Sequence, residues 1–289
     1  MRVSLLYNKQ AGDGVPIDRI RNTIAHHGHE LICAVENQTE VERLLERLPE
    51  VVVAAGGDGT VALAARMLAR TGIPLSILPL GTANNIARSV GIPDSIDEII
   101  RRLETARRVP LDLGVADGVW GQQYFVEGVG GGLISTAIAD TDTRADGNKL
   151  ATRSKLAGAI RTIGGVLSRL QPVEWTIVAD GARTTREILL VEVLNIRSIG
   201  PNLVLSPDAN PFDGLFRLVM VSEDHRNELA RYLRDLLDGR DHPPLLTSQG
   251  ARHVTFDGAT DVHVDDELLS TRSRQVSMHV EAGALELLV

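Results

Sequence analysis

The sequence is poor in several residue types that mark particular classes of protein. Cys33 is the one cysteine among 289 residues, which excludes an internal disulfide and suits a reducing compartment. Aromatic residues make up 3% of the chain, and no apolar run approaches the roughly 20 residues of a membrane span. Met1–Leu6 runs directly into a predicted strand, without the pattern of a secretory leader. We therefore expect a cytoplasmic protein whose contact with a membrane, if it has any, is peripheral.

The chain also lacks an excess of positive charge. Lysine and arginine total 30 against 38 aspartate and glutamate residues, giving a formal net charge of −8. Proteins that bind nucleic acid across a broad face show the opposite balance, so we expect no nucleic-acid partner. The length exceeds the roughly 250 residues at which single cores stop growing, which predicts two domains.

The first third of the chain alternates strand-like runs with helical periodicity. Strands are predicted at Val3–Tyr7, Leu31–Val35, Val51–Ala55 and Leu75–Leu80, and helices at Ile17–His27, Glu40–Leu48 and Val61–Arg70. This alternation is typical of βαβ units around a parallel sheet. After about Pro110 the pattern changes to short runs bounded by Gly, Asp and Pro, which predicts a β-rich, mostly antiparallel region. Two helices, Leu156–Leu170 and Arg226–Leu237, are predicted to interrupt it.

Two glycine-rich turns stand where a predicted strand enters a predicted helix. Gly56-Gly57-Asp58-Gly59-Thr60 follows one strand, and Pro79-Leu80-Gly81-Thr82-Ala83-Asn84-Asn85 ends the next. Such turns let backbone N–H groups and the helix N-terminus approach a phosphate closely. The charge of Asp58 would repel a bare phosphate, so it suggests a nucleotide that carries Mg²⁺. The alternative is a tight turn in which Asp58 caps the helix.

Two better-known phosphate motifs do not account for these turns. Gly57-x-Gly59-x-x-Ala62 matches the dinucleotide fingerprint, but the acidic residue expected about 20 positions later is absent. A Walker-type loop requires Gly-Lys followed by Ser or Thr, and this triplet does not occur. The sequence therefore argues against a Rossmann dehydrogenase and against a P-loop ATPase.

The two turns, in this order and at this separation, resemble the diacylglycerol kinase catalytic-domain family, which includes soluble bacterial lipid kinases and sphingosine kinases. Four further segments resemble family motifs in the same order. They are the N-terminal nucleotide loop (Asn8-x-x-Ala11-Gly12), the interdomain turn (Leu111–Gly114), the Mg-associated loop (Ser206–Leu215) and the C-terminal segment with the base (Val264–Glu267). The resemblance thus covers nearly the whole chain.

This resemblance implies a fold and an activity. The fold would be a three-layer α/β nucleotide-binding domain like those of phosphofructokinase and NAD kinase, over residues 1–112, and a C-terminal β-sandwich over 113–278. Residues 279–289 would return to the first domain. The activity would be transfer of the γ-phosphoryl group of ATP, in a cleft between the domains, to a hydroxyl of a lipid such as diacylglycerol or a sphingoid base. Peripheral contact at the inner membrane surface and a homodimer are further features that the family would bring.

The resemblance also assigns roles to individual residues. Those implied to bind ATP are Asn8, Thr39, Gly56, Gly57, Asp58, Gly59, Thr60, Val61, Ala62, Gly81, Thr82 and Asn84. Asp58 and Asp112 would act through water and Mg²⁺ on the charge of the transferred group, and Glu267 would be the general base. A structural Mg²⁺ would be held by Asn210, Asp213 and Leu215.

Two positions depart from the family pattern. The second turn usually ends in Asn-Asp, whereas this chain has Asn84-Asn85, so one carboxylate is replaced by an amide. The C-terminal segment usually reads Asp-Gly-Glu, and Asp266 occupies the glycine position; if that position needs a positive φ, Asp266 must adopt it. Three alternatives stay open. They are a catalytically weak or regulatory nucleotide-binding relative, a kinase of a non-lipid alcohol, and a NAD kinase-like enzyme, which would carry Asn-Glu in the second turn.

Overall fold

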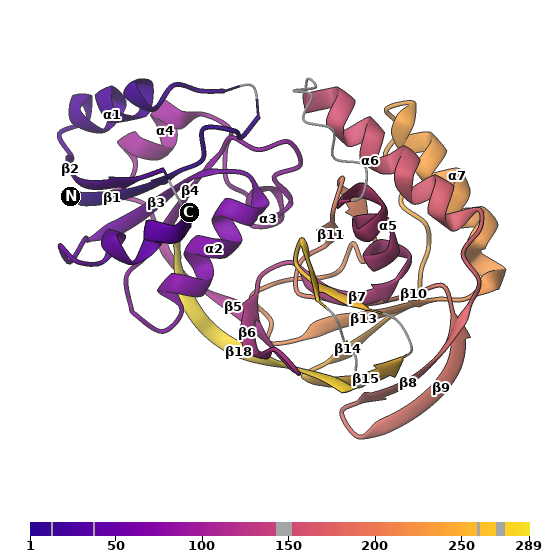
Figure 1. Cartoon of the computed structure of the whole chain (residues 1–289). Helices are drawn as coiled ribbons and strands as arrows, with labels where there is room; N and C mark the ends of the chain where they lie inside the picture. The colour runs from indigo at the N-terminus through magenta and orange to yellow at the C-terminus, as the bar shows by residue number, and fades with distance from the viewer. Residues whose placement is uncertain (13, 37, 143–151, 259–260, 270–274) are drawn as a thin grey trace. The chain divides into compact units, whose positions relative to one another are not determined.

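The computed structural model of the chain describes residues 1–12, 14–36, 38–142, 152–258, 261–269 and 275–289 (Figure 1). The chain divides into two compact units. Unit 1 consists of Met1–Leu113 together with Ala282–Val289, and unit 2 is Gly114–Glu281.

Unit 1 is built on a parallel sheet. Its strands, in spatial order, are β2 (Glu30–Val35), β1 (Arg2–Tyr7), β3 (Val51–Gly56) and β4 (Leu75–Pro79). Every residue of β3 is buried, as expected for a strand that is covered on both faces. The end of β18 (Gln275–Leu288) adds a parallel neighbour to β4, where Leu287 pairs with Leu75.

Helices cover both faces of this sheet. On one face, α1 (Ile17–His26) and α4 (Ile96–Arg101) share an apolar cluster with β1 and β3. On the other face, α2 (Asp58–Leu68) packs against β3 and β4, next to η1 (Gln38–Leu44) and the short α3 (Asn85–Ser89), as Figure 1 shows. The three-layer α/β architecture expected from the sequence is confirmed.

Two predicted helices differ in detail. The segment predicted as a helix over Glu40–Leu48 overlaps the 3₁₀-helix η1, which ends at Leu44. Over the described residues 40–48, Leu44 is the only fully buried side chain, and the segment has no continuous apolar stripe. The helix predicted to start at Val61 begins at Asp58, inside the glycine-rich turn.

Unit 2 contains a six-stranded antiparallel sheet and a second antiparallel sheet. The first has the order β14 (Ser248–Ala251), β13 (Phe216–Val221), β10 (Leu190–Leu194), β7 (Gly128–Gly132), β16 (Val262–Val264) and β17 (Glu267–Leu269). The second contains the first part of β18, β15 (His253–Gly258), β8 (Val173–Ala179) and β9 (Ala182–Ile188), with β6 (Gly121–Phe125) paired to β5 (Arg108–Gly118). A small hairpin joins β11 (Ser198–Ile199) to β12 (Leu203–Val204).

Side chains of β10 alternate between two apolar clusters. Val191 and Val193 pack with Trp175 and other side chains of the second sheet, which makes a sandwich. Leu190 and Leu194 point the other way, toward a cluster formed by three helices. These helices are α5 (Leu133–Asp142), α6 (Thr152–Leu167) and α7 (Arg226–Leu237), and Figure 1 shows them on one side of the six-stranded sheet. The expected C-terminal β-sandwich is confirmed. Across the described ranges, no helix has the length and apolarity needed to cross a membrane.

Candidate functional site

Three loops of unit 1 meet beyond the carboxyl ends of neighbouring strands. They are residues 8–12 after β1, residues 57–60 after β3 and residues 80–84 after β4. The backbone N–H of Asn8 donates to the carbonyl of Ala55 at 3.0 Å, and that of Leu80 donates to the carbonyl of Gly56 at 2.9 Å. The carboxyl edge of a parallel sheet is where ligands bind in folds of this kind.

Glycine allows these loops to touch through their backbones. A Cβ added to Gly81 would lie 2.3 Å from the Cα of Gly57, and one added to Gly12 would lie 2.1 Å from the carbonyl oxygen of Leu80. Gly12 also has a φ of +53°, which L side chains rarely adopt. No side chain fits between the loops, so backbone groups form much of the surface where they meet.

Helix α2 begins at this meeting point. Its N-cap is Gly57, which offers no side chain to bind the first N–H groups of the helix. The Asn8 amide donates to the hydroxyl of Thr60 at 3.4 Å, and its oxygen accepts the backbone N–H of Gln10 at 2.9 Å. An uncapped helix start beside a glycine loop is suited to an anion such as a phosphate.

The second turn is held by Asn84 and by Asp58. Asn84 has a φ of +53°; its oxygen accepts the N–H of Gly81 at 2.9 Å, and its amide donates to the carbonyl of Pro79 at 3.1 Å. Asp58 accepts the backbone N–H of Ile86 at 3.0 Å, so its carboxylate links the start of α2 to that of α3. Asn85 is buried. Asn84 therefore shapes the turn.

The remaining residues expected to bind ATP differ in how exposed their side chains are. Thr82 is half-buried in the same turn, whereas Val61 and Ala62 are 3% and 2% exposed, so they can offer only backbone to a nucleotide. Thr39 lies in η1, and its side chain falls outside the described part of the chain.

Asp112 lies within a strand, although its segment was expected to form a turn. It belongs to β5, is 5% exposed, and accepts the N–H of Gly283 at 2.8 Å. Gly283 lies in the part of β18 that belongs to unit 1. The carboxylate of Asp112 thus ties β5 to β18.

Glu267 is the first residue of β17, in unit 2, and its side chain is exposed. Gln123 donates a hydrogen bond to its carboxylate at 3.3 Å. The tight turn before it takes its positive φ, +53°, at Asp265. The strain considered for Asp266 is therefore carried by its neighbour, an aspartate, which tolerates this conformation better than most residues.

The expected cation loop, Ser206–Leu215, already binds a positive group, the guanidinium of Arg217 in the adjoining strand β13. The Asp213 carboxylate accepts the N–H of Leu215 at 3.0 Å and the Arg217 guanidinium at 2.6 Å. Arg217 also donates to Asp208 at 3.1 Å, and its side chain is 12% exposed. The carbonyls of Asn210 and Leu215 accept the N–H of Asp213 and the guanidinium of Arg217, at 3.4 and 3.5 Å.

These contacts decide whether a resident Mg²⁺ fits the loop. Its donors are oxygens of the kind that Mg²⁺ takes. However, the hydroxyl of Ser206, helped by a backbone N–H and by the guanidinium of Arg217, holds the pKa of Asp208 below its usual value, and the cation that these carboxylates face is Arg217. A divalent ion among the same oxygens would be repelled by the guanidinium. The residues as arranged do not fit a resident Mg²⁺, and within the described ranges no three His, Cys, Asp or Glu side chains gather as a metal site.

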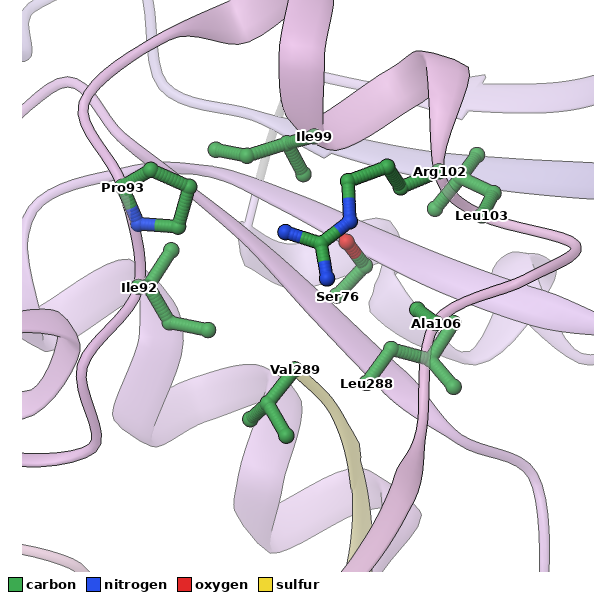
Figure 2. A pocket seen from close by; sticks show the side chains of 9 residues that line it. All are labelled: Ser76, Ile92, Pro93, Ile99, Arg102, Leu103, Ala106, Leu288 and Val289. Atoms are coloured by element: carbon green, nitrogen blue, oxygen red, sulfur yellow. The ribbon is translucent and has the colours of Figure 1, made fainter.

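Unit 1 also contains a small apolar pocket at the opposite end of β4 (Figure 2). Its lining includes the Ser76 hydroxyl, the Arg102 guanidinium and Leu288, and the cavity measures about 20 Å³. That volume admits about one water molecule, so the pocket is too small for a substrate.

Comparison with known proteins agrees with this arrangement. Residues 2–116 match the diacylglycerol kinase catalytic domain, and residues 135–289 match the YegS C-terminal NAD kinase beta sandwich-like domain. The chain is 30% identical to a Pseudomonas aeruginosa protein named "Probable lipid kinase YegS-like", over 97% of this chain and 91% of that one. It is 31% identical to the diacylglycerol kinase of Bacillus subtilis, over 73% of this chain and 68% of that one.

A solved structure shares the fold. The crystal structure of a diacylglycerol kinase from Bacillus anthracis str. Sterne superposes with a TM-score of 0.71 at 20% identity, covering 99% of this chain and 96% of that one. With both domain types matched in order and relatives aligned over nearly their full length, the chain belongs to the family of diacylglycerol kinases and YegS-like lipid kinases.

Proposed function

We propose that this protein is an ATP-dependent lipid kinase that transfers the γ-phosphoryl group of ATP to a hydroxyl of diacylglycerol or a sphingoid base. The observation that carries the proposal is the meeting of three loops around the uncapped start of α2. Relatives named for lipid kinase activity, aligned over most of the chain, support the lipid class of the acceptor.

The loops would hold the phosphates of ATP, which enters as its Mg²⁺ complex. Backbone N–H groups at Gly57–Gly59 and the positive end of α2 favour the negative charge of the nucleotide. The Mg²⁺ that arrives with ATP offsets charge on the transferred group. The loop at Asp213 takes no part in this step, because Arg217 already binds its carboxylate.

Glu267 would supply the base. The acceptor oxygen forms a bond to the γ-phosphorus as the bond between that phosphorus and the ADP oxygen breaks, and the hydroxyl proton passes to the Glu267 carboxylate. A primary alcohol holds its proton far above neutral pH, so a carboxylate within hydrogen-bond reach must accept it during the transfer. A lipid acceptor also requires contact with a membrane surface, which we place at the cytoplasmic face of the inner membrane. A homodimer stays a prediction.

The test is the fate of labelled phosphate. Purified protein is incubated with γ-labelled ATP and Mg²⁺, and with diacylglycerol, monoacylglycerol, sphingosine or ceramide in mixed micelles, or with NAD. Chromatography then identifies the product. A labelled lipid supports the proposal and names the acceptor, whereas labelled NADP would replace it with a NAD kinase. Measurable ATP binding without any product would favour a regulatory module or a non-lipid alcohol as the acceptor.

Replacing Glu267 tests the proposed base. Glu267→Gln removes the proton acceptor but keeps the shape of the side chain, so we expect lipid phosphorylation to fall by at least about 100-fold, with ATP affinity unchanged. Asp266→Asn is a matched control, since Asp266 is the exposed neighbouring acid, and it should retain activity. Turnover of labelled lipid and equilibrium binding of ATP measure the two effects. A fully active Glu267→Gln enzyme contradicts the assignment.

A further inference from the structure

Two ionisable side chains are sealed inside unit 2. Glu192 in β10 and His263 in β16 are both 0% exposed, and the Nε2 atom of His263 lies 3.0 Å from a carboxylate oxygen of Glu192. Both pair with Gly130 of β7, one from each side, so the two side chains meet above the middle strand. Helix α5 packs on this part of the sheet.

The sheet leaves room for this pair. A Cβ added to Gly130 would lie 2.2 Å from the carboxyl group of Glu192, so any residue other than glycine at position 130 would displace that group. Gly130 therefore leaves the space that the buried carboxyl group of Glu192 occupies.

The surroundings determine where one proton lies. The Nδ1 atom of His263 is 2.9 Å from the backbone carbonyl of Asp265, which can only accept a hydrogen bond, so Nδ1 carries a hydrogen. A second proton must then lie between Nε2 and Glu192, on one atom or the other. Without it, a carboxylate would face a lone pair inside the core, at a high cost in free energy.

Asp265 connects this pair to the hairpin of Glu267. Its N–H donates to the carbonyl of Gly128 at 2.8 Å, and its carboxylate accepts the N–H groups of Val126, Glu127 and Gly128 at 2.8–3.3 Å. Asp265 is 3% exposed, holds the positive φ of the turn, and lies two positions before Glu267. Its backbone carbonyl accepts the hydrogen bond that Nδ1 of His263 donates.

We propose that Glu192 and His263 are positioning residues that share a proton and fix the Asp265 turn, and thereby hold Glu267 for the reaction. This inference rests on the proposed role of Glu267 as the base. A buried ion pair can often be replaced by apolar side chains of similar volume without loss of stability. Two ionisable groups kept in a core therefore need another reason, and the contact with Asp265 provides one.

The experiment compares two variants with the wild-type protein. Glu192→Met combined with His263→Leu removes both polar groups and leaves the Asp265 carbonyl without its donor. Glu192→Gln keeps the geometry, because the new amide can donate to Nε2 of a neutral His263 whose Nδ1 still donates to Asp265. For each protein we measure thermal unfolding, kcat, the KM for ATP, and hydrogen exchange at the amides of Val126–Gly128.

The double variant should fold, with kcat lowered on the order of 10- to 100-fold, an unchanged KM for ATP and faster exchange at the three amides. Glu192→Gln should stay within about threefold of wild-type kcat. Wild-type kcat and exchange in the double variant would overturn the proposal. So would a loss of kcat with unchanged exchange, because the turn would then not be the route of the effect.

A measurement on the wild-type protein covers the case in which the double variant does not fold. Nitrogen NMR of the His263 ring should show a hydrogen on Nδ1, and a ring bare at Nδ1 overturns the proposal. Failure of the proposed function is recognised separately. It would appear as a wild-type protein that phosphorylates no lipid or as a fully active Glu267→Gln enzyme, and neither result alters the NMR or exchange readout.

Discussion

Gly57 and Gly81 touch backbone to backbone, and this contact sets the shape of the candidate nucleotide site. Because real Cβ atoms essentially never approach a neighbour as closely as 2.3 Å, the contact admits no side chain at Gly81 without movement of backbone. The residues around it are fixed by hydrogen bonds from backbone N–H groups: Asn84 accepts one from Gly81 in its own turn, and Asp58 accepts one from Ile86 at the start of α3. The shape of the candidate site thus depends on close backbone contact between the two glycine-rich turns.

Replacing Gly81 tests this contact. Gly81→Ala should push the second turn away from Gly57, with at least a tenfold loss of ATP affinity, because about 1.4 kcal/mol of lost binding energy corresponds to a factor of ten. Titration with ATP measures it. The control is Gly164→Ala on α6, where a Cβ meets nothing within 4 Å and helix propensity favours alanine by about 1 kcal/mol. Equal ATP affinity in the two variants would contradict this reading of the turn.

At this scale the sequence indicated part of the candidate site. The glycine-rich turns and Asp58 were identified because loops that admit a phosphate require particular residues at fixed spacing, and Asn84 was indicated by the family resemblance. Glu192 was missed, because a single glutamate in an apolar strand belongs to no local pattern. Its partner His263 lies far along the chain, and only the sheet brings the two together.

Among the elements, the loop around Asp213 is stabilised by a guanidinium from the adjoining strand β13. Arg217 binds Asp208 and Asp213, and its own pKa is raised because the two carboxylates outweigh the opposing effect of burial.

We predict that Mg²⁺ and EDTA give the same melting temperature for the wild-type protein. Arg217→Gln should lower that temperature, and Mg²⁺ should restore part of the loss, since the two carboxylates then lack a cation. Scanning calorimetry of both proteins, in Mg²⁺ and in EDTA, checks both expectations. A wild-type protein that EDTA destabilises would refute the claim.

The pair Glu192–His263 makes the stability of unit 2 depend on pH. Burial alone would lower the pKa of His263, but the Glu192 carboxylate and the contact with Asp265 raise it above its usual value. The charge of the buried Asp265 carboxylate also raises this pKa, and the buried Glu127 lies next to that carboxylate. Other ionisable groups on the neighbouring elements are the exposed Glu267 on β17 and Asp140 on α5, which pairs with Arg169; β7 contains only glycine and valine.

Because the folded-state pKa is raised, the stabilisation is fully present below the unfolded value of about 6.5 and is lost as pH rises through the folded value. We therefore predict that the wild-type protein has a larger free energy of unfolding than Glu192→Gln. This difference should be largest at pH below about 6.5 and smaller at higher pH. Urea melts at a series of pH values measure this difference. A difference that grows with pH would contradict the prediction.

The elements that the sequence mispredicted have physical causes. Strand β7, Gly128–Gly132, was not expected, because glycine is disfavoured in strands; here all five positions are buried and large neighbours such as the Glu192 side chain occupy the space. The segment of η1 has helical composition, but among its described side chains only Leu44 is a fully buried anchor, so it forms a short 3₁₀-helix. Strands β1 and β3 were predicted closely, because buried parallel strands read as continuous apolar runs.

For the whole molecule, the fold class followed from the change in pattern along the chain. Alternating strands and helices predicted the α/β layers, and short strands bounded by turns predicted a β-rich, mostly antiparallel region, which the family resemblance identified as a sandwich. The last residues complete the first unit: Leu287 and Leu288 are 0% and 5% exposed, and Leu287 pairs with Leu75 of β4. Local pattern gives no register for such a distant pairing, so the structure was needed to show it.

Leu287→Ala tests this dependence. Removing a buried leucine side chain should cost unit 1 about 2–5 kcal/mol of unfolding free energy. Both tryptophans, Trp120 and Trp175, belong to unit 2, so their fluorescence follows that unit, while ATP binding at the proposed site would follow unit 1. As denaturant is added, the Leu287→Ala protein should lose ATP binding at a lower denaturant concentration than that of its fluorescence transition. Glu286→Ala, at a partly exposed ion pair, is the control and should shift neither by more than about 1 kcal/mol. Equal shifts of both signals in Leu287→Ala would show that the units do not unfold separately.

The return of β18 also has a consequence for synthesis. A ribosome makes the chain from Met1 onward, so the four parallel strands of unit 1 emerge early, yet the strand end that pairs with β4 is translated after the whole of unit 2. Unit 1 therefore begins to form first and is completed last. Until its last few residues leave the ribosome, β4 presents an open edge, the kind of surface that invites pairing with other chains, and chaperones that shield such edges would act during this interval.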